Sequence, residues 1–283
     1  MRASAIALVI LVGCAPAPRN GNGGGGDDDT NTGADAGSGQ TGSNQGSNGS
    51  NGGTGSDVVY VYAHTATTLY RVDPDSLAIS EVGDFGWPNG DDQMTDIAID
   101  KNGQMVGISF GSVYKVDSGN AKATLMSSSL QGDFNGLSYV PASLVNGGSG
   151  DDVLVGTRND DGAVFEINPN TGATTQIGNM GGGFMSSGDI VAVDGLGILQ
   201  TVPGNGGDML TTLASGSFSA TVVGSTQYDQ IWGLAFWKNK VFGFTNGGAF
   251  VTIDPHTGAT TMVSNNGEAW WGAAVTTKAL VIQ

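Results

Sequence analysis

The feature that most constrains the fold of this 283-residue chain is a unit that recurs five times after about residue 57. Each copy has two segments of alternating apolar residues on either side of a short turn. The clearest copies span residues 69–83, 164–178 and 250–263, and weaker ones span 113–125 and 210–224. Steps of 44, 51, 46 and 40 residues separate the equivalent positions Val72, Val116, Ile167, Leu213 and Ile253. Periods of this length are typical of repeat architectures.

Each copy is predicted to be a β-hairpin. Its turn, as in 168–172, places Pro second and Gly where a left-handed backbone is needed. Two more short strands precede four of the hairpins, for example at 97–99 and 105–108. Four strands in about 45 residues make a propeller blade, and no segment has a sustained helical period. We therefore predict an all-β fold, a β-propeller of five blades with four antiparallel strands each.

The first blade lacks its innermost strand at the start of the repeat region, because 58–62 lies only ten residues before Val72. The segment 271–277 aligns with the innermost strands of the other blades. We therefore expect a C-terminal strand to complete the first blade and close the ring. Residues 279–283 are a second candidate for the strand position that 58–62 fills, so a sixth, incomplete blade stays open.

The repeat pattern, hydrophobic-x-hydrophobic-Asp/Asn-Pro-x-Thr/Ser-Gly-x-x-Thr, resembles the repeats of bacterial secreted β-propellers, loosely the NHL and SMP-30-like group. The sequence lacks the Trp-Asp dipeptide, the paired kelch glycines, the Asp-x-Asp-x-Asp-Gly calcium loop and the Asp-box. The resemblance therefore implies the fold and little about function.

Acidic and aromatic residues gather in the connectors that join the outermost strand of one blade to the innermost strand of the next. Aromatic rings stack on the apolar face of a sugar while carboxylates accept from its hydroxyls, and both groups also suit a cationic peptide. The candidate ligand-binding face consists of Trp87, Asp92, Asp133, Phe134, Phe184, Tyr228, Asp229, Glu268, Trp270 and Trp271. The alternative is that Trp232, Trp270 and Trp271 pack between blades and that the acidic residues form Asx turns.

A calcium site is a second hypothesis. Asp96 and Asp189 occupy equivalent positions at the mouth of the central channel and, with Asn135, could offer oxygen ligands. An SMP-30-like lactonase would use such an ion to polarise a carbonyl. Against this, two aspartates in five blades are few, and crowding around the axis explains the glycines in the other blades, Gly136, Gly233 and Gly272.

Catalytic side chains are hard to assemble from this sequence. His64 lies at a strand end, and His256 lies in a turn whose counterparts are Asp75 and Asn170. Neither histidine has a neighbouring nucleophile or paired-carboxylate motif. We assign no catalytic residue.

The N-terminus predicts a signal peptide of residues 1–13, with Met1 and Arg2 before an apolar stretch at 3–12. The order Leu11-Val-Gly-Cys14 resembles the lipobox of bacterial lipoproteins, which implies a diacylglyceryl group on Cys14. In that family an Asp after the cysteine favours the inner membrane. Here Ala15 and Pro16 follow, so the resemblance implies an outer-membrane lipoprotein of the cell envelope.

Residues 14–56 are Gly, Ser, Asn and Asp with almost nothing apolar, which predicts a disordered linker before a propeller at 57–283. The net charge of −16, with 10 Lys and Arg against 26 Asp and Glu, argues against nucleic acid or anionic lipid as a partner. With one cysteine, the domain has no disulfide. We expect a monomeric, non-enzymatic lipoprotein that binds an envelope glycan, peptide or protein. The alternative is a calcium-dependent propeller hydrolase or lactonase.

Overall fold

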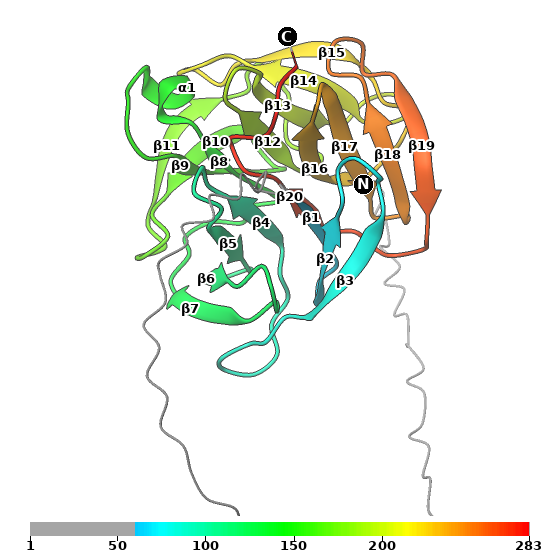
Figure 1. Ribbon diagram of the computed structural model, residues 1–283. Coiled ribbons are helices and arrows are strands. Elements are labelled where there is room, and N and C mark those ends of the chain that lie inside the picture. Colours follow the sequence, from blue (N-terminus) through cyan, green and yellow to red (C-terminus); the bar gives the residue numbers. More distant parts are fainter. Residues whose placement is uncertain (1–59, 283) are drawn as a thin grey trace, which may run out of the picture. The chain divides into compact units, whose positions relative to one another are not determined.

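The computed structural model describes residues 60–282, which form a five-bladed β-propeller (Figure 1). Each blade is a four-stranded antiparallel sheet, and the innermost strands contact one another around a central axis. The predicted fold class and blade number are confirmed. The signal peptide (1–13), Cys14 and the linker (14–56) lie outside the described residues.

Blades are numbered along the chain, and their strands are given from the axis outward. Blade 1 consists of β20 (Gly272–Ala274), β1 (Val61–His64), β2 (Thr68–Val72) and β3 (Ile79–Asp84). Blade 2 consists of β4 (Asp96–Ile99), β5 (Met105–Ile108), β6 (Val113–Val116) and β7 (Ala123–Ser127). Blade 3 consists of β8 (Gly136–Val140), β9 (Val153–Thr157), β10 (Ala163–Ile167) and β11 (Thr174–Asn179). Blade 4 consists of β12 (Ile190–Val193), β13 (Gly197–Val202), β14 (Met209–Leu213) and β15 (Ala220–Ser225). Blade 5 consists of β16 (Ile231–Trp237), β17 (Lys240–Thr245), β18 (Ala249–Ile253) and β19 (Thr260–Asn265).

The predicted hairpins are the two outer strands of each blade, and their shared details reflect the sequence repeat. Every outer pair has a register shift at the same place, between the fourth-last and third-last residues of the third strand. Asn168 and Asp254 accept N–H groups of their own turns through a side-chain oxygen. Gly172 and Gly258 have φ of 71° and 73°, the left-handed backbone that the pattern predicted.

The ring is closed by β20, which pairs antiparallel with β1 and supplies the missing strand of blade 1. Tyr62 lies opposite Ala274 in this pair, and His64 lies opposite Gly272. The predicted closure by a C-terminal strand is therefore confirmed.

Residues 279–282 form no strand, so the alternative of a sixth blade is wrong for the described part of the chain. After β20 the chain instead crosses the end of the propeller opposite the connectors. Thr276 Oγ1 donates to the Asp100 carbonyl of blade 2 and Thr277 Oγ1 to the Asp152 carboxylate of blade 3, at 2.8 and 2.7 Å. The chain then meets blade 4 through Lys278 with Asp194, and blade 5 through the Lys238 N–H with the Leu280 carbonyl. This C-terminal tail thus ties four blades together.

Apolar side chains fill the space between neighbouring blades. In blade 5, for example, Phe244 and Phe250 stack with centroids 4.6 Å apart. The single described helix, α1 (Ala142–Asn146), is a short insertion in blade 3. Among residues 60–282, no helix has the length and apolar content needed to cross a bilayer.

Candidate functional site

A cavity opens on the connector face, the end of the propeller where each outermost strand connects to the next innermost strand. Its volume is about 800 Å³. Four blades and the segment that enters β20 contribute side chains, so the cavity is centred near the axis. A concave site with aromatic walls and a few polar groups is typical of a small-ligand site.

One ring of repeat-equivalent positions supplies much of the lining. The residue directly before the axial position of each innermost strand is Thr95, Asn135, Gly188, Trp232 or Trp271, and all except Gly188 line the cavity. Gly188 leaves no room for a side chain, because an added Cβ would overlap the Ile231 carbonyl oxygen and the Trp232 Cα. The same repeat position therefore supplies two indoles, an amide and a hydroxyl to one surface.

Trp232 and Trp271 form an aromatic corner, with ring centroids 6.4 Å apart and planes at 84°. Both side chains are half-buried. Trp232 is the extra residue of a β-bulge, since Ile231 and Gly233 pair with consecutive residues of β17. A bulge redirects a side chain that regular pairing would hold on the other face of the sheet.

A second group of lining residues comes from the loops between the second and third strands, which lie at the same end because the strands alternate in direction. These residues are Phe110, Asn159, Pro203 and Asp208. Phe110 is 62% exposed and Met185, from a connector, is 37% exposed, so the rim carries accessible apolar side chains. The sequence reasoning considered only the connectors and missed this group. The alternation of strand direction was the signal that could have found it.

Asp208 is a carboxylate nearly enclosed by protein, with 5% of its surface exposed. Its Oδ2 accepts the Ile231 N–H at 2.9 Å, and its backbone N–H donates to the Tyr228 carbonyl at 2.7 Å. Burial raises the pKa of Asp208 to about 6, the Ile231 N–H opposes this, and the nearby charge of Asp229 adds to it. Asp208 is therefore a fixed carboxylate in the cavity wall, and Asp229 is an exposed one beside it.

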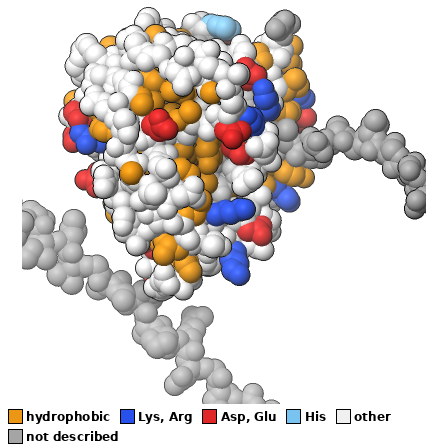
Figure 2. Space-filling view, turned by 90° about the vertical axis from the view of Figure 1, so that its left-hand side faces the viewer, with side chains coloured by type: hydrophobic (Ala, Val, Ile, Leu, Met, Phe, Trp, Pro, Cys, Tyr) orange, Lys and Arg blue, Asp and Glu red, His pale blue; other side chains and the backbone are white. Residues whose placement is uncertain are grey.

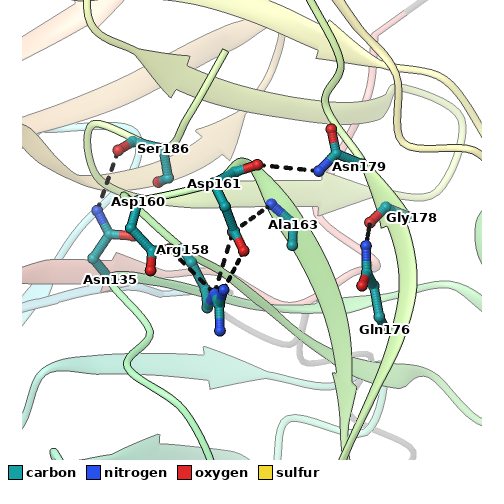
Figure 3. Close-up of polar contacts among 9 residues, drawn as sticks. All are labelled: Asn135, Arg158, Asp160, Asp161, Ala163, Gln176, Gly178, Asn179 and Ser186. Carbon is teal, nitrogen blue, oxygen red and sulfur yellow. Dashed lines mark hydrogen bonds and ion pairs between the residues drawn. The ribbon is translucent and has the colours of Figure 1, made fainter. Parts of the chain in front are cut away.

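Arg158 of blade 3 does not line the cavity, and Figure 3 shows its contacts with Asp160 and Asp161. Its guanidinium pairs with Asp160 and Asp161 and lies over the Phe165 ring, 5.0 Å from the centroid. In the same view the Asn135 Nδ2 donates to the Ser186 carbonyl at 3.5 Å. The Asn135 Oδ1 has no hydrogen-bond partner, although it is buried from solvent. The cavity wall contains no basic side chain.

Three of the ten residues predicted for the binding face line this cavity: Phe134, Asp229 and Trp271. Phe134 is only 7% exposed and also packs against Phe165, so it contributes an edge of its ring. Trp232, which the sequence reasoning treated as packing between blades, belongs to the site. Its Trp-Gly dipeptide recurs at Trp271-Gly272, and this match is the signal that was available.

The other predicted face residues do not line the cavity. Trp270 is fully buried against Tyr70 and Phe244, as the packing alternative describes. Trp87, which that alternative did not include, packs on Phe85 and Tyr114. Asp92 accepts a hydrogen bond from the Tyr114 hydroxyl at 2.7 Å. The remaining residues lie elsewhere on the connectors: Asp133 exposed, and Phe184, Tyr228 and Glu268 partly buried.

Below the cavity, Asp96 and Asp189 occupy the axis and are fully buried, with glycines at the same position in the other blades. The crowding argument holds, because a Cβ on Gly272 would overlap the Asp96 carboxylate and the His64 ring. Asp96 Oδ1 accepts the Ile97 N–H at 2.8 Å. Asp189 accepts the N–H groups of Ile190 and Leu234 at 2.6 and 2.7 Å. The carboxylates thus satisfy N–H groups on the inner edges of the blades.

The electrostatics of the axis favour a shared proton. Burial and the charge of Asp189 raise the pKa of Asp96 well above its usual range, and burial also raises the pKa of Asp189. Asp96 Oδ2 has no hydrogen-bond donor, so we assign the proton to it. His64 Nδ1 donates to the Thr65 carbonyl at 2.8 Å, and burial lowers the pKa of His64 to about 4. His64 is therefore neutral, and its Nε2 lies 3.8 Å from Asp96 Oδ1.

This arrangement does not fit the calcium hypothesis. Three of the four carboxylate oxygens accept backbone N–H groups. Calcium in proteins takes six to eight oxygen ligands, and this pair of carboxylates cannot supply that number. Residues 60–282 contain no group of three or more His, Cys, Asp or Glu side chains placed to hold a metal ion. The pair serves the inner strands, and we derive no reaction step through it.

The outer surface shows no concentration of basic charge on the side seen in Figure 2, where acidic and basic side chains are interspersed over a mostly neutral surface. Every described ion pair of a Lys or Arg is made with a neighbouring Asp. His256 lies exposed in its turn, as the sequence indicated.

No family model matches the chain, and no curated protein matches it. Solved structures do match. One, from work on the de novo evolutionary emergence of a symmetrical protein shaped by folding constraints, is 15% identical with a TM-score of 0.51. A structure from a nidogen/laminin complex is 8% identical with a TM-score of 0.51, and each match covers 78% of this chain and 100% of the other. TolB from Acinetobacter baumannii is 13% identical over 74% of this chain and 51% of its own, with a TM-score of 0.42. At these identities the likeness shows the fold alone.

Proposed function

We propose that this protein is a membrane-tethered binding module without enzymatic activity, whose connector-face cavity holds part of an envelope glycan, peptide or protein. The observation that carries the proposal is the composition of the cavity wall. Two indoles at a right angle, an exposed Phe and Met at the rim, and amides and carboxylates stand around about 800 Å³ of space. Such walls give a ligand both ring contacts and hydrogen bonds.

The absence of an assembled set of catalytic groups around the cavity in residues 60–282 favours binding over catalysis. Asp208 and Asp229 are the only titratable side chains in the wall, and no histidine or lysine lines it. A hydrolase needs a nucleophile or an activated water beside a general base. The cavity wall therefore supports a binding function better than the calcium-dependent hydrolase or lactonase alternative.

The test is a binding screen with the full chain against three sets of probes: defined oligosaccharides, cell-wall fragments and short peptides. Trp232→Ala with Trp271→Ala is expected to weaken binding of any positive probe by at least about tenfold, because hot-spot aromatics carry about 2 kcal/mol or more each. Trp87→Ala is the matched control, since Trp87 packs between blades 1 and 2 and does not line the cavity. Unchanged binding by the double variant would contradict the proposal that this cavity is the binding site.

The tether rests on the sequence around Cys14, and its test is separate. Cys14→Ser is expected to move the protein from the membrane fraction to the soluble fraction, because stable anchoring needs the acyl chains attached to that thiol. Fractionation of cells followed by immunoblotting measures this, with wild type and Ala15→Ser as references. Retention of Cys14→Ser in the membrane would contradict lipid anchoring and leave the binding proposal untouched.

A further inference from the structure

The charges that border the cavity are of one sign. Asp208 and Asp229 line it, and no lysine, arginine or histidine does. Within residues 60–282 neither carboxylate takes part in an ion pair. Because Asp208 is 5% exposed, it has lost most of its water without gaining a counter-ion. A ligand with a positive group would supply that counter-ion.

The hydrogen-bonding groups of the wall also favour a ligand that donates. Asn135 contributes a side-chain amide to the wall, and its Nδ2 lies 3.5 Å from the Ser186 carbonyl oxygen. The amides of Asn159 and Gln230 and the hydroxyl of Thr95 add groups that both accept and donate. Hydroxyls and ammonium protons of a ligand would satisfy such a wall.

The aromatic corner adds a preference for shape. The ring planes of Trp232 and Trp271 lie at 84° to each other, and both residues line the cavity together with Gln230 and Asp229. A pyranose ring stacks on an indole face through its C–H groups, and an ammonium group is attracted to the negative face of an indole. A flat aromatic or purely aliphatic ligand would leave the carboxylates and Asn135 without partners.

We propose that the ligand of this cavity is an amino sugar with a free amine, whose ammonium group lies against Asp208 and whose ring stacks in the corner of Trp232 and Trp271. This inference rests on the proposed binding function and names its ligand class. Asp208 acts as the fixed counter-ion, held by the Ile231 N–H, and Asp229 attracts the ammonium group at the mouth.

The experiment compares oligomers of glucosamine with oligomers of N-acetylglucosamine of the same length, using titration calorimetry on the full chain. The two probes differ in one group, an ammonium against a neutral acetamide. We expect the amine to bind at least about tenfold more tightly at neutral pH. Asp208→Asn keeps an acceptor for the Ile231 N–H but removes the charge, and is expected to abolish the preference without lowering the melting temperature.

The pH profile gives a second readout. The pKa of Asp208 is about 6, so its ionised form, which binds the ammonium group, declines as the pH falls through that value. Asp229 is the only other titratable side chain in the wall, and His64, Asp96 and Asp189 lie below on the axis. The amine of the probe gains its proton as the pH falls toward this range, so affinity in wild type is expected to pass through a maximum near about pH 6.5 and then to fall several-fold toward about pH 5, as Asp208 loses its charge. In Asp208→Asn affinity for the amine is expected to stay low, with no fall below about pH 6. In Asp229→Asn the fall is expected to persist but to shift to lower pH, because the charge of Asp229 helps to raise the pKa of Asp208.

The outcomes separate this inference from the proposed function. Equal binding of both oligomers, lost in the Trp232 and Trp271 double variant, would overturn the amine preference and leave the binding cavity standing. Preferential binding of a lysine peptide, with neither sugar bound, would overturn the assignment of a sugar ring but support a positively charged group beside Asp208. Binding of no probe would contradict the amino sugar directly.

Discussion

Trp270→Ala is expected to lower the free energy of unfolding by about 3–5 kcal/mol, the range for truncating a fully buried Trp or Phe. The side chain has no exposed surface, and its ring lies 5.1 Å from Tyr70 and 5.5 Å from Phe244 between centroids. Collapse around the deleted indole is limited because these partners belong to blades 1 and 5. In a domain of this size the loss corresponds to a melting temperature roughly 10 °C lower.

The control for this prediction is the next residue. Trp271→Ala removes a half-buried ring from the cavity wall and is expected to change stability by about 1 kcal/mol while weakening ligand binding. Denaturant unfolding followed by tryptophan fluorescence, or thermal melts by circular dichroism, measures both variants. If Trp271→Ala lowered the stability more than Trp270→Ala, the assignment of Trp270 to the core and Trp271 to the cavity wall would be wrong.

Asp189→Ala is expected to destabilise the ring by about 2–4 kcal/mol, even though it removes a buried charge. The N–H groups of Ile190 and Leu234 lose their acceptor, and each buried N–H left unsatisfied costs about 1–3 kcal/mol. Relief of the charge burial offsets only part of this. The measurement is chemical denaturation at neutral pH.

Asp96→Asn is the informative partner, because an amide reproduces the shape of the protonated carboxyl. The pKa of Asp96 is raised in the folded protein, so the folded state holds that proton more tightly than the unfolded chain. The resulting stability is complete below the unfolded value of 3.8 and is lost as the pH rises through the folded pKa. As the pH rises from 3.8 toward the raised pKa of the folded protein, wild type is therefore expected to lose more stability than Asp96→Asn. Parallel pH profiles for the two proteins would contradict a shared axial proton.

The fold could be predicted from sequence because the same hairpin repeat occurs five times. The turn residues and apolar alternation recur in each copy, and the missing first strand indicated where the ring closes. The tail could not be predicted, since residues 279–282 are a short apolar run of the kind that forms strands, but they are held by single contacts to other blades, such as Leu280 with Lys238. Local pattern cannot distinguish these two uses of an extended segment.

The site was predicted in position but only partly in composition. A cavity does open on the connector face that the sequence indicated. Trp270 and Trp271 are neighbours in sequence, however, and only the packing of blade 1 against blade 5 decides which one is buried. The bulge that turns Trp232 into the cavity has no sequence signature of its own. Asp208 lies in a glycine-rich loop that looks like an ordinary turn, and its burial depends on the connector that covers it.

The pairing of β1 with β20 has a consequence for how the chain reaches its native state. Tyr62 and Ala274 meet although on the order of 200 residues separate them. During synthesis, blades 2 to 5 can assemble from neighbouring segments, but blade 1 must wait with an unpaired inner edge until residue 274 has emerged. An exposed strand edge is a template for wrong partners. The slow step of folding is thus expected to be the docking of this one short strand, and the half-finished ring is the species most exposed to aggregation.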